Sequence, residues 1–123
     1  MNDLNLKSCT IDELIAQFVE HAVEQNATVD YLDHDRYEAL DKLIAAISQE
    51  LSRRGLKARQ QLLPLYQHRE AQVRLQAARF TYGVTPEAAR KCIQAIADSH
   101  IRPQNFEARM LLTSIDTGIE KPD

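Results

Sequence analysis

The densest group of side chains that could do chemistry begins at residue 30. Asp30, Asp33, His34 and Asp35 stand close together in the chain, and carboxylates beside an imidazole are used for metal binding and general acid–base catalysis. The segment has neither a glycine nor the ligand spacing of a calcium loop. The simpler interpretation is that these residues cap helices and carry solvated charge. We therefore predict no metal site and no cofactor.

A third interpretation assigns this acidic segment to the binding of another protein. Tyr31 and Tyr37 would anchor the contact, and the carboxylates around them would meet a basic partner. The residues predicted to contact the partner are Glu20, Glu24, Asp30, Tyr31, Asp33, Asp35, Glu38 and Asp41.

The strongest basic run follows the acidic segment and consists of Arg53, Arg54, Lys57 and Arg59. Such a run could bind phosphates, as in helical-repeat proteins that cradle duplex DNA. The alternative is that these side chains complement the negative end of a helix dipole and point into solvent. Arg74, further along, is predicted to be a structural arginine that bridges neighbouring helices.

The remaining reactive side chains do not form a recognisable catalytic pattern. Cys92 lies on an apolar helix face and is predicted to be a small core residue, and Cys9 has no base near it in the sequence. The four histidines fall in four segments and never at paired ligand spacing. The sequence contains no glycine-rich phosphate loop, nucleophile elbow or paired-histidine helix. We expect no catalytic residue and no enzyme.

Helices must position all of these residues, because glycine (3) and proline (4) are scarce. Thr10 and Glu13 have the form of a capping box, Gly55 suits the position after a helix end, and Thr85-Pro86 is a start signal. Pro64 should kink the third helix or make it begin anew. The predicted helices span residues 10–26, 36–54, 57–66, 70–82, 86–99 and 104–115.

Apolar residues recur along these segments at steps of three and four. The first helix should bury Ile11, Leu14, Ile15, Phe18, Val19 and Ala22, and the second Tyr37, Leu40, Ile44, Ile47 and Leu51. The sixth should present Phe106, Met110, Leu111 and Ile115. The short connections between the segments predict consecutive antiparallel pairs.

Length and composition predict one all-α domain that covers residues 1–123. Hydrophobic residues make up 44% and charged residues 27%, an ordinary globular balance. No secretory signal and no apolar run of membrane-spanning length stands in the sequence, so we expect a cytoplasmic protein with reduced cysteines. Trp is absent, which argues against an aromatic platform for single-stranded nucleic acid.

The net charge of −3 hides an asymmetry along the chain. Residues 1–50 carry eleven acidic and three basic side chains, whereas residues 51–123 carry seven acidic and twelve basic ones. This distribution predicts one acidic and one basic surface for partners.

The segment LLPLYQHREAQVRLQAARF, residues 62–80, resembles a HEAT-type repeat. Its proline, Val73-Arg74 and Ala77-Ala78 match the repeat pattern, and Glu70 stands near the place of the aspartate that faces the repeat arginine. The whole chain also looks like a small bacterial family of HEAT-like proteins known only as a domain of unknown function. The resemblance implies about six helices in antiparallel pairs that form a short right-handed α-α superhelix, a scaffold for binding.

These observations predict a non-enzymatic module that binds another protein through its acidic surface. A small acidic module suits an immunity or antitoxin role, because many nuclease toxins are basic and an acidic inhibitor mimics their substrate. The alternative is a DNA- or RNA-binding repeat protein that uses the basic run. The oligomeric state is left open.

Overall fold

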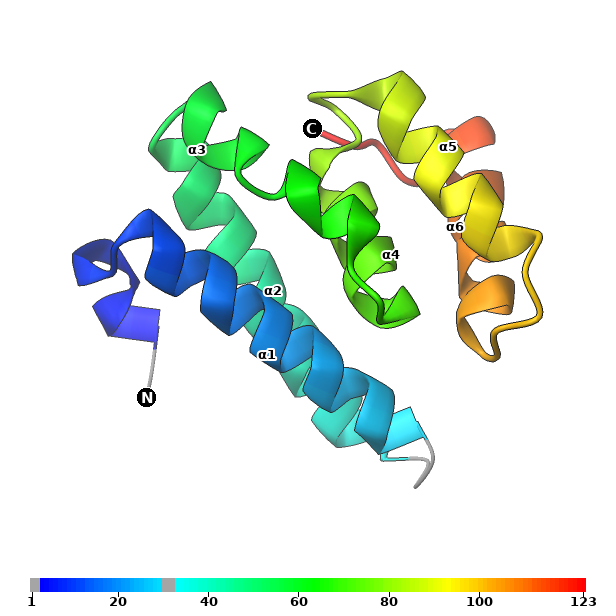
Figure 1. Cartoon of the computed structure of the whole chain (residues 1–123), viewed down its shortest axis with the longest axis horizontal. Helices are drawn as coiled ribbons and strands as arrows, with labels where there is room; N and C mark the ends of the chain where they lie inside the picture. Colours follow the sequence, from blue (N-terminus) through cyan, green and yellow to red (C-terminus); the bar gives the residue numbers. More distant parts are fainter. Residues whose placement is uncertain (1–2, 30–32) are drawn as a thin grey trace. The chain divides into compact units, whose positions relative to one another are not determined.

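The computed structural model describes residues 3–29 and 33–123, and these form helices and turns without a strand (Figure 1). The prediction of an all-α fold is confirmed. The described elements are the 3-10 helices η1 (Asp3–Ser8) and η2 (Leu63–Gln67) and the α-helices α1 (Ile11–Val29), α2 (His34–Arg53), α3 (Leu56–Gln60), α4 (Ala71–Thr81), α5 (Pro86–Ala97) and α6 (Gln104–Asp116).

The contacts within the chain divide it into two compact units, Met1–Leu62 and Leu63–Asp123. The first unit contains η1, α1, α2 and α3, and the second contains η2, α4, α5 and α6. Neighbouring helices in each unit pack in pairs, as expected for short connections. The prediction of a single domain over residues 1–123 stays a prediction.

Helix α1 begins with the predicted capping box. The Glu13 amide donates to Thr10 Oγ1 (3.1 Å) and the Thr10 amide donates to Glu13 Oε1 (2.7 Å). Leu14 and Phe18 are fully buried, and α1 and α2 run antiparallel along one another (Figure 1). The helix continues three residues beyond its predicted end, to Val29.

Helix α2 has a well-defined start and end. Its N-cap is Asp33, whose Oδ1 accepts from the Arg36 amide at 3.1 Å. The predicted stripe is fully buried at Leu40, Ile44 and Leu51, nearly so at Ile47, and half-buried at Tyr37. After the helix, Gly55 takes a φ of +111°, a backbone angle that side chains with a Cβ avoid.

The third predicted helix is divided in two. Helix α3 ends at Gln60, and a new 3-10 helix, η2, begins at Leu63 and contains Pro64. Proline has no amide hydrogen, and its ring crowds the preceding turn, so a continuous α-helix through this position is disfavoured. Of the two expectations for Pro64, a kink or a new helix, the structure therefore shows the new helix.

The core of the second unit lies between α4, α5 and α6. Its buried members are Leu75, Ala78, Ala89, Ile93, Ile96, Ala97, Ala108 and Leu112, and Tyr66, Tyr82, Cys92 and Leu111 pack against them. Four of the buried residues are alanines, whose small side chains allow the helices to approach closely. The predicted Pro86 start of α5 is confirmed.

The buried face of α6 differs from the predicted one. Phe106 and Met110 are exposed, whereas Gln104, Asn105, Ala108 and Leu112 are buried. The Gln104 side-chain amide donates to Gln72 Oε1 at 3.1 Å, so the buried polar group of Gln104 is satisfied. The spacing of the apolar residues predicted a different buried face, because the pairing of Gln104 with Gln72 has no signal in the local sequence.

Gly83 lies in close contact with the backbone of Asp123. A Cβ atom on Gly83 would stand 1.6 Å from the carbonyl carbon of Asp123, so only glycine lets Asp123 pack there.

Among residues 3–29 and 33–123, no helix is long and apolar enough to cross a membrane.

Candidate protein-binding surfaces

The acidic residues predicted to bind a partner divide into two groups in the first unit. Asp30 and Tyr31 lie outside the described residues. Glu24, Asp33 and Asp41 hold the unit together: Glu24 pairs with Arg36, Asp33 caps α2, and Asp41 Oδ1 accepts from the buried Gln25 amide at 3.4 Å. These three carboxylates therefore stabilise the fold, and we do not count them as partner-binding residues.

The other three predicted residues, Glu20, Asp35 and Glu38, are exposed. Glu20 lies on α1 one turn from Val23, which is 39% exposed. Asp35 and Glu38 are one turn apart on the outer side of α2, and Lys42 follows Glu38 at the next turn. We call Glu20, Asp35 and Glu38 the acidic surface. It is smaller than the predicted set because Glu24, Asp33 and Asp41 stabilise the fold and because Asp30 and Tyr31 lie outside the described residues.

Two of the four basic residues of the alternative nucleic-acid surface, Arg53 and Arg54, pair with a buried carboxylate. Glu50 has a side chain only 9% exposed, and it pairs with Arg53 (3.5 Å) and with Arg54 Nε (3.0 Å). Arg54 Nη2 also donates to the carbonyl oxygens of Leu6 (2.9 Å) and Lys7 (3.3 Å). Arg54 thus ties η1 to the end of α2, a role with no signal in the sequence because the two segments are far apart.

The last two residues of the basic run differ in exposure. Lys57 is exposed on α3, and Arg59 is half-buried. The four cations therefore do not present equivalent charges to solvent. A phosphate that approached this run would meet Lys57 and Arg53, and it would compete with Glu50 for Arg53.

Arg74 has the predicted structural role, but its guanidinium stabilises a turn. Its Nη1 donates to the carbonyl oxygens of His68 (2.7 Å) and Arg69 (3.1 Å), immediately before α4. The backbone carbonyl of Arg74 also accepts from Cys92 Sγ at 3.8 Å. Burial raises the pKa of the half-buried Cys92 thiol, which keeps it protonated and supports its predicted role as a packing residue.

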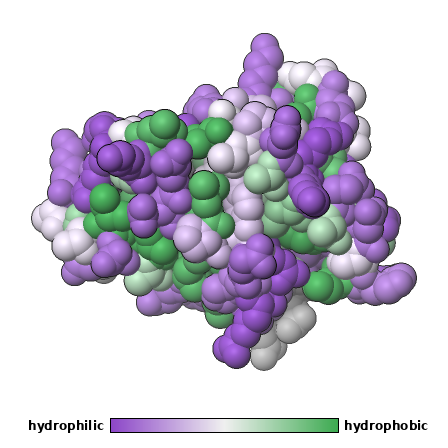
Figure 2. Space-filling view, turned by 45° about the horizontal axis from the view of Figure 1, so that its top comes forward, coloured by the Kyte–Doolittle hydropathy of each residue, from purple (hydrophilic) through white to green (hydrophobic). Residues whose placement is uncertain are grey.

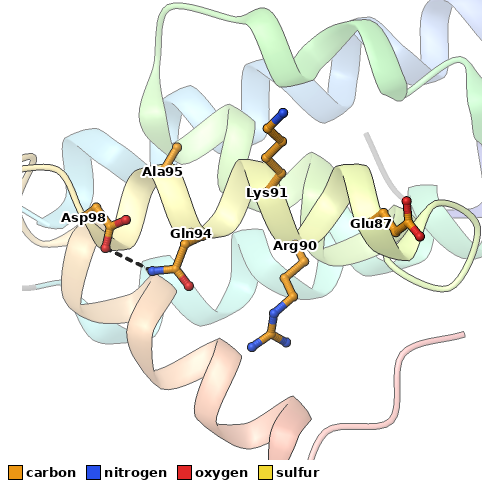
Figure 3. A pocket seen from close by; sticks show the side chains of 6 residues that line it. All are labelled: Glu87, Arg90, Lys91, Gln94, Ala95 and Asp98. Atoms are coloured by element: carbon orange, nitrogen blue, oxygen red, sulfur yellow. Dashed lines mark hydrogen bonds between the residues drawn. The ribbon is translucent and has the colours of Figure 1, made fainter.

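A shallow depression of about 550 Å³ lies along the outer side of α5 (Figure 3). It is lined by Glu87, Arg90, Lys91, Gln94, Ala95 and Asp98. Two of its charged groups are already occupied: Arg90 pairs with Asp116 at 2.8 Å, and Asp98 accepts from Gln94 at 3.0 Å. Lys91 and Arg90 project to opposite sides of the helix (Figure 3), so the lining offers no convergent set of catalytic groups.

Sequence reasoning missed a surface at the start of α6. Phe106 is 48% exposed and Met110 is 70% exposed, although both are large and apolar. The guanidinium carbons of Arg102 and Arg109 lie over the Phe106 ring, 5.7 and 5.5 Å from its centre. Figure 2 shows one face of the molecule, on which hydrophobic residues form separate areas among hydrophilic ones. The signal available in the sequence is the spacing of Phe106 and Met110, which by itself indicates a core stripe.

In the part of the chain that the structure describes, histidine, cysteine and carboxylate side chains do not gather in a group of three that could hold a metal ion. The four histidines were expected to be separate, and the two cysteines are free thiols.

Comparison with known proteins gives a family and a structural relative. The sequence model of a family described as a domain of unknown function (DUF2019) matches residues 12–116. A crystal structure of the protein RPA1889 from Rhodopseudomonas palustris CGA009 has 37% sequence identity and a TM-score of 0.85, over 93% of this chain and 94% of that chain. No curated protein matches.

Proposed function

The chain belongs to the DUF2019 family, and since that family's description assigns no activity, we propose a function from the surfaces of the chain itself. The protein is a non-enzymatic binding module. It acts as an immunity- or antitoxin-type inhibitor that blocks a basic, nuclease-like protein through the acidic surface. The reduced state of Cys9 and Cys92 that this proposal assumes corresponds to a cytoplasmic setting.

The observation that carries the proposal is the exposure of Glu20, Asp35 and Glu38 on the first unit. That unit has eleven acidic and seven basic residues, and Arg36 and Arg54 among the basic ones are held in ion pairs. A nuclease must attract phosphates and is therefore basic near its active site. An acidic inhibitor is steered to that site by the same field.

The scaffold for this binding is a HEAT-like pair of helices in the middle of the chain. The support for this part of the proposal is the turn before α4, which Arg74 stabilises, and the buried small pair Ala77-Ala78. An experimental structure of the chain tests it. In a HEAT-like stack, successive helix pairs are related by a regular rotation, so the pair η2–α4 should superpose on the pair α5–α6. Two pairs that do not superpose in this way would contradict the proposal.

The binding proposal is tested first by affinity capture with the tagged protein from a lysate of its source organism, at low and moderate salt. The captured proteins are identified by mass spectrometry, and a stoichiometric basic protein is then purified. Its association rate with the wild-type chain is measured by surface plasmon resonance over a range of ionic strengths. We expect rapid association at low salt that slows as salt screens the charges.

The decisive variant is Glu20→Gln/Asp35→Asn/Glu38→Gln, which removes three charges and leaves the Asp33 cap intact. We expect its association rate at low salt to fall about tenfold, with a weaker dependence on ionic strength. The matched control, Glu87→Gln/Asp98→Asn/Glu120→Gln, removes the same charge from the second unit and should leave the rate nearly unchanged.

Equal rates for the wild type and the acidic-surface variant would refute the assignment of this surface. Capture of nucleic acid in place of a protein, lost as salt rises, would favour the alternative function. In that case Lys57→Gln should weaken binding more than the acidic-surface variant does, since Lys57 is an exposed member of the basic run.

A further inference from the structure

The surface at the start of α6 has no role in the proposed function. It consists of Arg102, Phe106, Arg109 and Met110, and we call it the Phe106 surface. Phe106 and Met110 are one turn apart on the same side of the helix. Both are exposed to water, Phe106 at 48% and Met110 at 70%. The helix packs into its own unit through a different side, that of Gln104, Ala108 and Leu112.

The two arginines hold the exposed ring without covering it. Their guanidinium groups lie 5.7 and 5.5 Å from the ring centre, within the range of a cation–π contact. Arg109 is additionally anchored, because its Nε donates to the Ala97 carbonyl at 3.1 Å. The result is an exposed apolar pair whose aromatic ring is flanked by two positive charges.

The chemistry of this surface selects its occupant. Burying Phe106 and Met110 requires an apolar side chain, and the flanking arginines require a carboxylate beside it. The chain itself carries this combination on α1, where the 39%-exposed Val23 lies one turn from the exposed Glu20. Ala16 and Ala27 on the same side of α1 are exposed and small, so an approaching helix meets no bulky side chain there.

We propose that the occupant of the Phe106 surface is a second copy of this chain, which docks through the Glu20–Val23 side of its α1. Val23 packs against Phe106 and Met110, and Glu20 accepts hydrogen bonds from Arg102. The two faces differ in charge, so the association joins unlike surfaces.

This inference goes beyond the proposed function, since it needs no second protein. It also has a consequence for it, because Glu20 belongs to both interfaces. A basic partner and a second copy then compete for α1, and self-association keeps part of the acidic surface covered until the partner arrives.

The test is sedimentation equilibrium of the purified full chain at low ionic strength over a range of protein concentrations. We expect a concentration-dependent rise in mass above that of one chain. Met110→Glu should raise the dissociation constant at least about tenfold, because it removes the apolar contact with Val23 and places a carboxylate one turn from Glu20. The control Ile119→Glu makes the same kind of change at a residue 81% exposed outside the Phe106 surface, and it should have no effect.

A charge exchange identifies the docking partner of Arg102. Glu20→Arg and Arg102→Glu should each weaken self-association about tenfold, and the double variant should recover most of the loss. Circular dichroism checks that each variant is folded.

Three results would overturn the inference. The wild-type chain could remain monomeric at every concentration. Met110→Glu could have no more effect than Ile119→Glu. The double variant could fail to recover association, which would mean that the occupant is not the α1 face of a second copy. Met110→Glu retains the acidic surface and should still bind a basic partner, so failure here is distinguishable from failure of the proposed function.

Discussion

Arg90 shows at the scale of single residues how one side chain joins three segments of the second unit. From α5 its guanidinium donates to both carboxylate oxygens of Asp116 on α6 at 2.8 Å, and Nη1 also donates to the Tyr82 hydroxyl at 3.2 Å. The bidentate geometry is the strong form of an arginine–carboxylate pair. Both groups are partly exposed, at 41% and 53%, so solvent screens the pair.

The Arg90–Asp116 pair predicts a dependence of stability on pH. The hydrogen bonds from Arg90 lower the pKa of Asp116 below the ordinary value of about 3.9, so the unfolded chain binds the proton more readily than the folded one. The stabilisation is therefore present above about pH 4 and is lost as pH falls through the lowered pKa. We expect the free energy of unfolding to decline less steeply in acid for Asp116→Asn than for the wild type.

Urea titrations at several pH values between neutrality and about pH 3 measure this difference. Asp98→Asn is the control, since the Asp98 carboxylate accepts a hydrogen bond from the neutral Gln94 amide and not from an arginine. A wild-type acid dependence that Asp116→Asn leaves unchanged would contradict the role of this pair.

At the scale of elements, α2 depends on its cap. Asp33 accepts the amide of Arg36 and so satisfies one of the donors that a helix start leaves unpaired. The same residue was predicted to bind a partner, and its charge reversal would confuse loss of binding with loss of the helix start. For this reason the acidic-surface variant leaves Asp33 unchanged.

We expect Asp33→Ala to lower the free energy of unfolding by about 1 kcal/mol, because it removes the cap hydrogen bond. Asp33→Asn should cost much less, since an asparagine side chain also caps well. Chemical denaturation followed by circular dichroism compares the two. Equal losses for both variants would show that the charge of Asp33, and not its cap bond, stabilises α2.

At the scale of the whole molecule, each unit comprises about sixty residues, a size at which a single core is marginal. We therefore expect the chain to unfold in one cooperative transition, as the prediction of a single domain implies. Thermal unfolding followed by circular dichroism and by the fluorescence of its tyrosines should give coincident curves. Two separated transitions would instead show that the units Met1–Leu62 and Leu63–Asp123 are independent domains.

Local signals predicted the features that depend on neighbours in the chain. The Thr10–Glu13 capping box, the buried stripe through Leu40 and Ile44, the positive φ at Gly55 and the break near Pro64 all follow from spacing and backbone preference. Contacts between distant segments were beyond such reasoning. Neither the tie from Arg54 to the Leu6 carbonyl nor the pairing of Glu24 with Arg36 has a counterpart in sequence spacing.

Three properties of this protein thus follow from its amino-acid order alone: the all-α class, the places where most helices begin, and the unequal distribution of charge along the chain. These properties arise from hydrogen bonds and side-chain periodicity within a few turns. Which charged and apolar residues face water depends instead on how the helices pack together. Gln104 is buried and bonded to Gln72, whereas Phe106 and Met110 on the same helix are exposed. The set of buried residues depends on the free energy of packing one helix against another, and the sequence of a single helix does not determine that free energy.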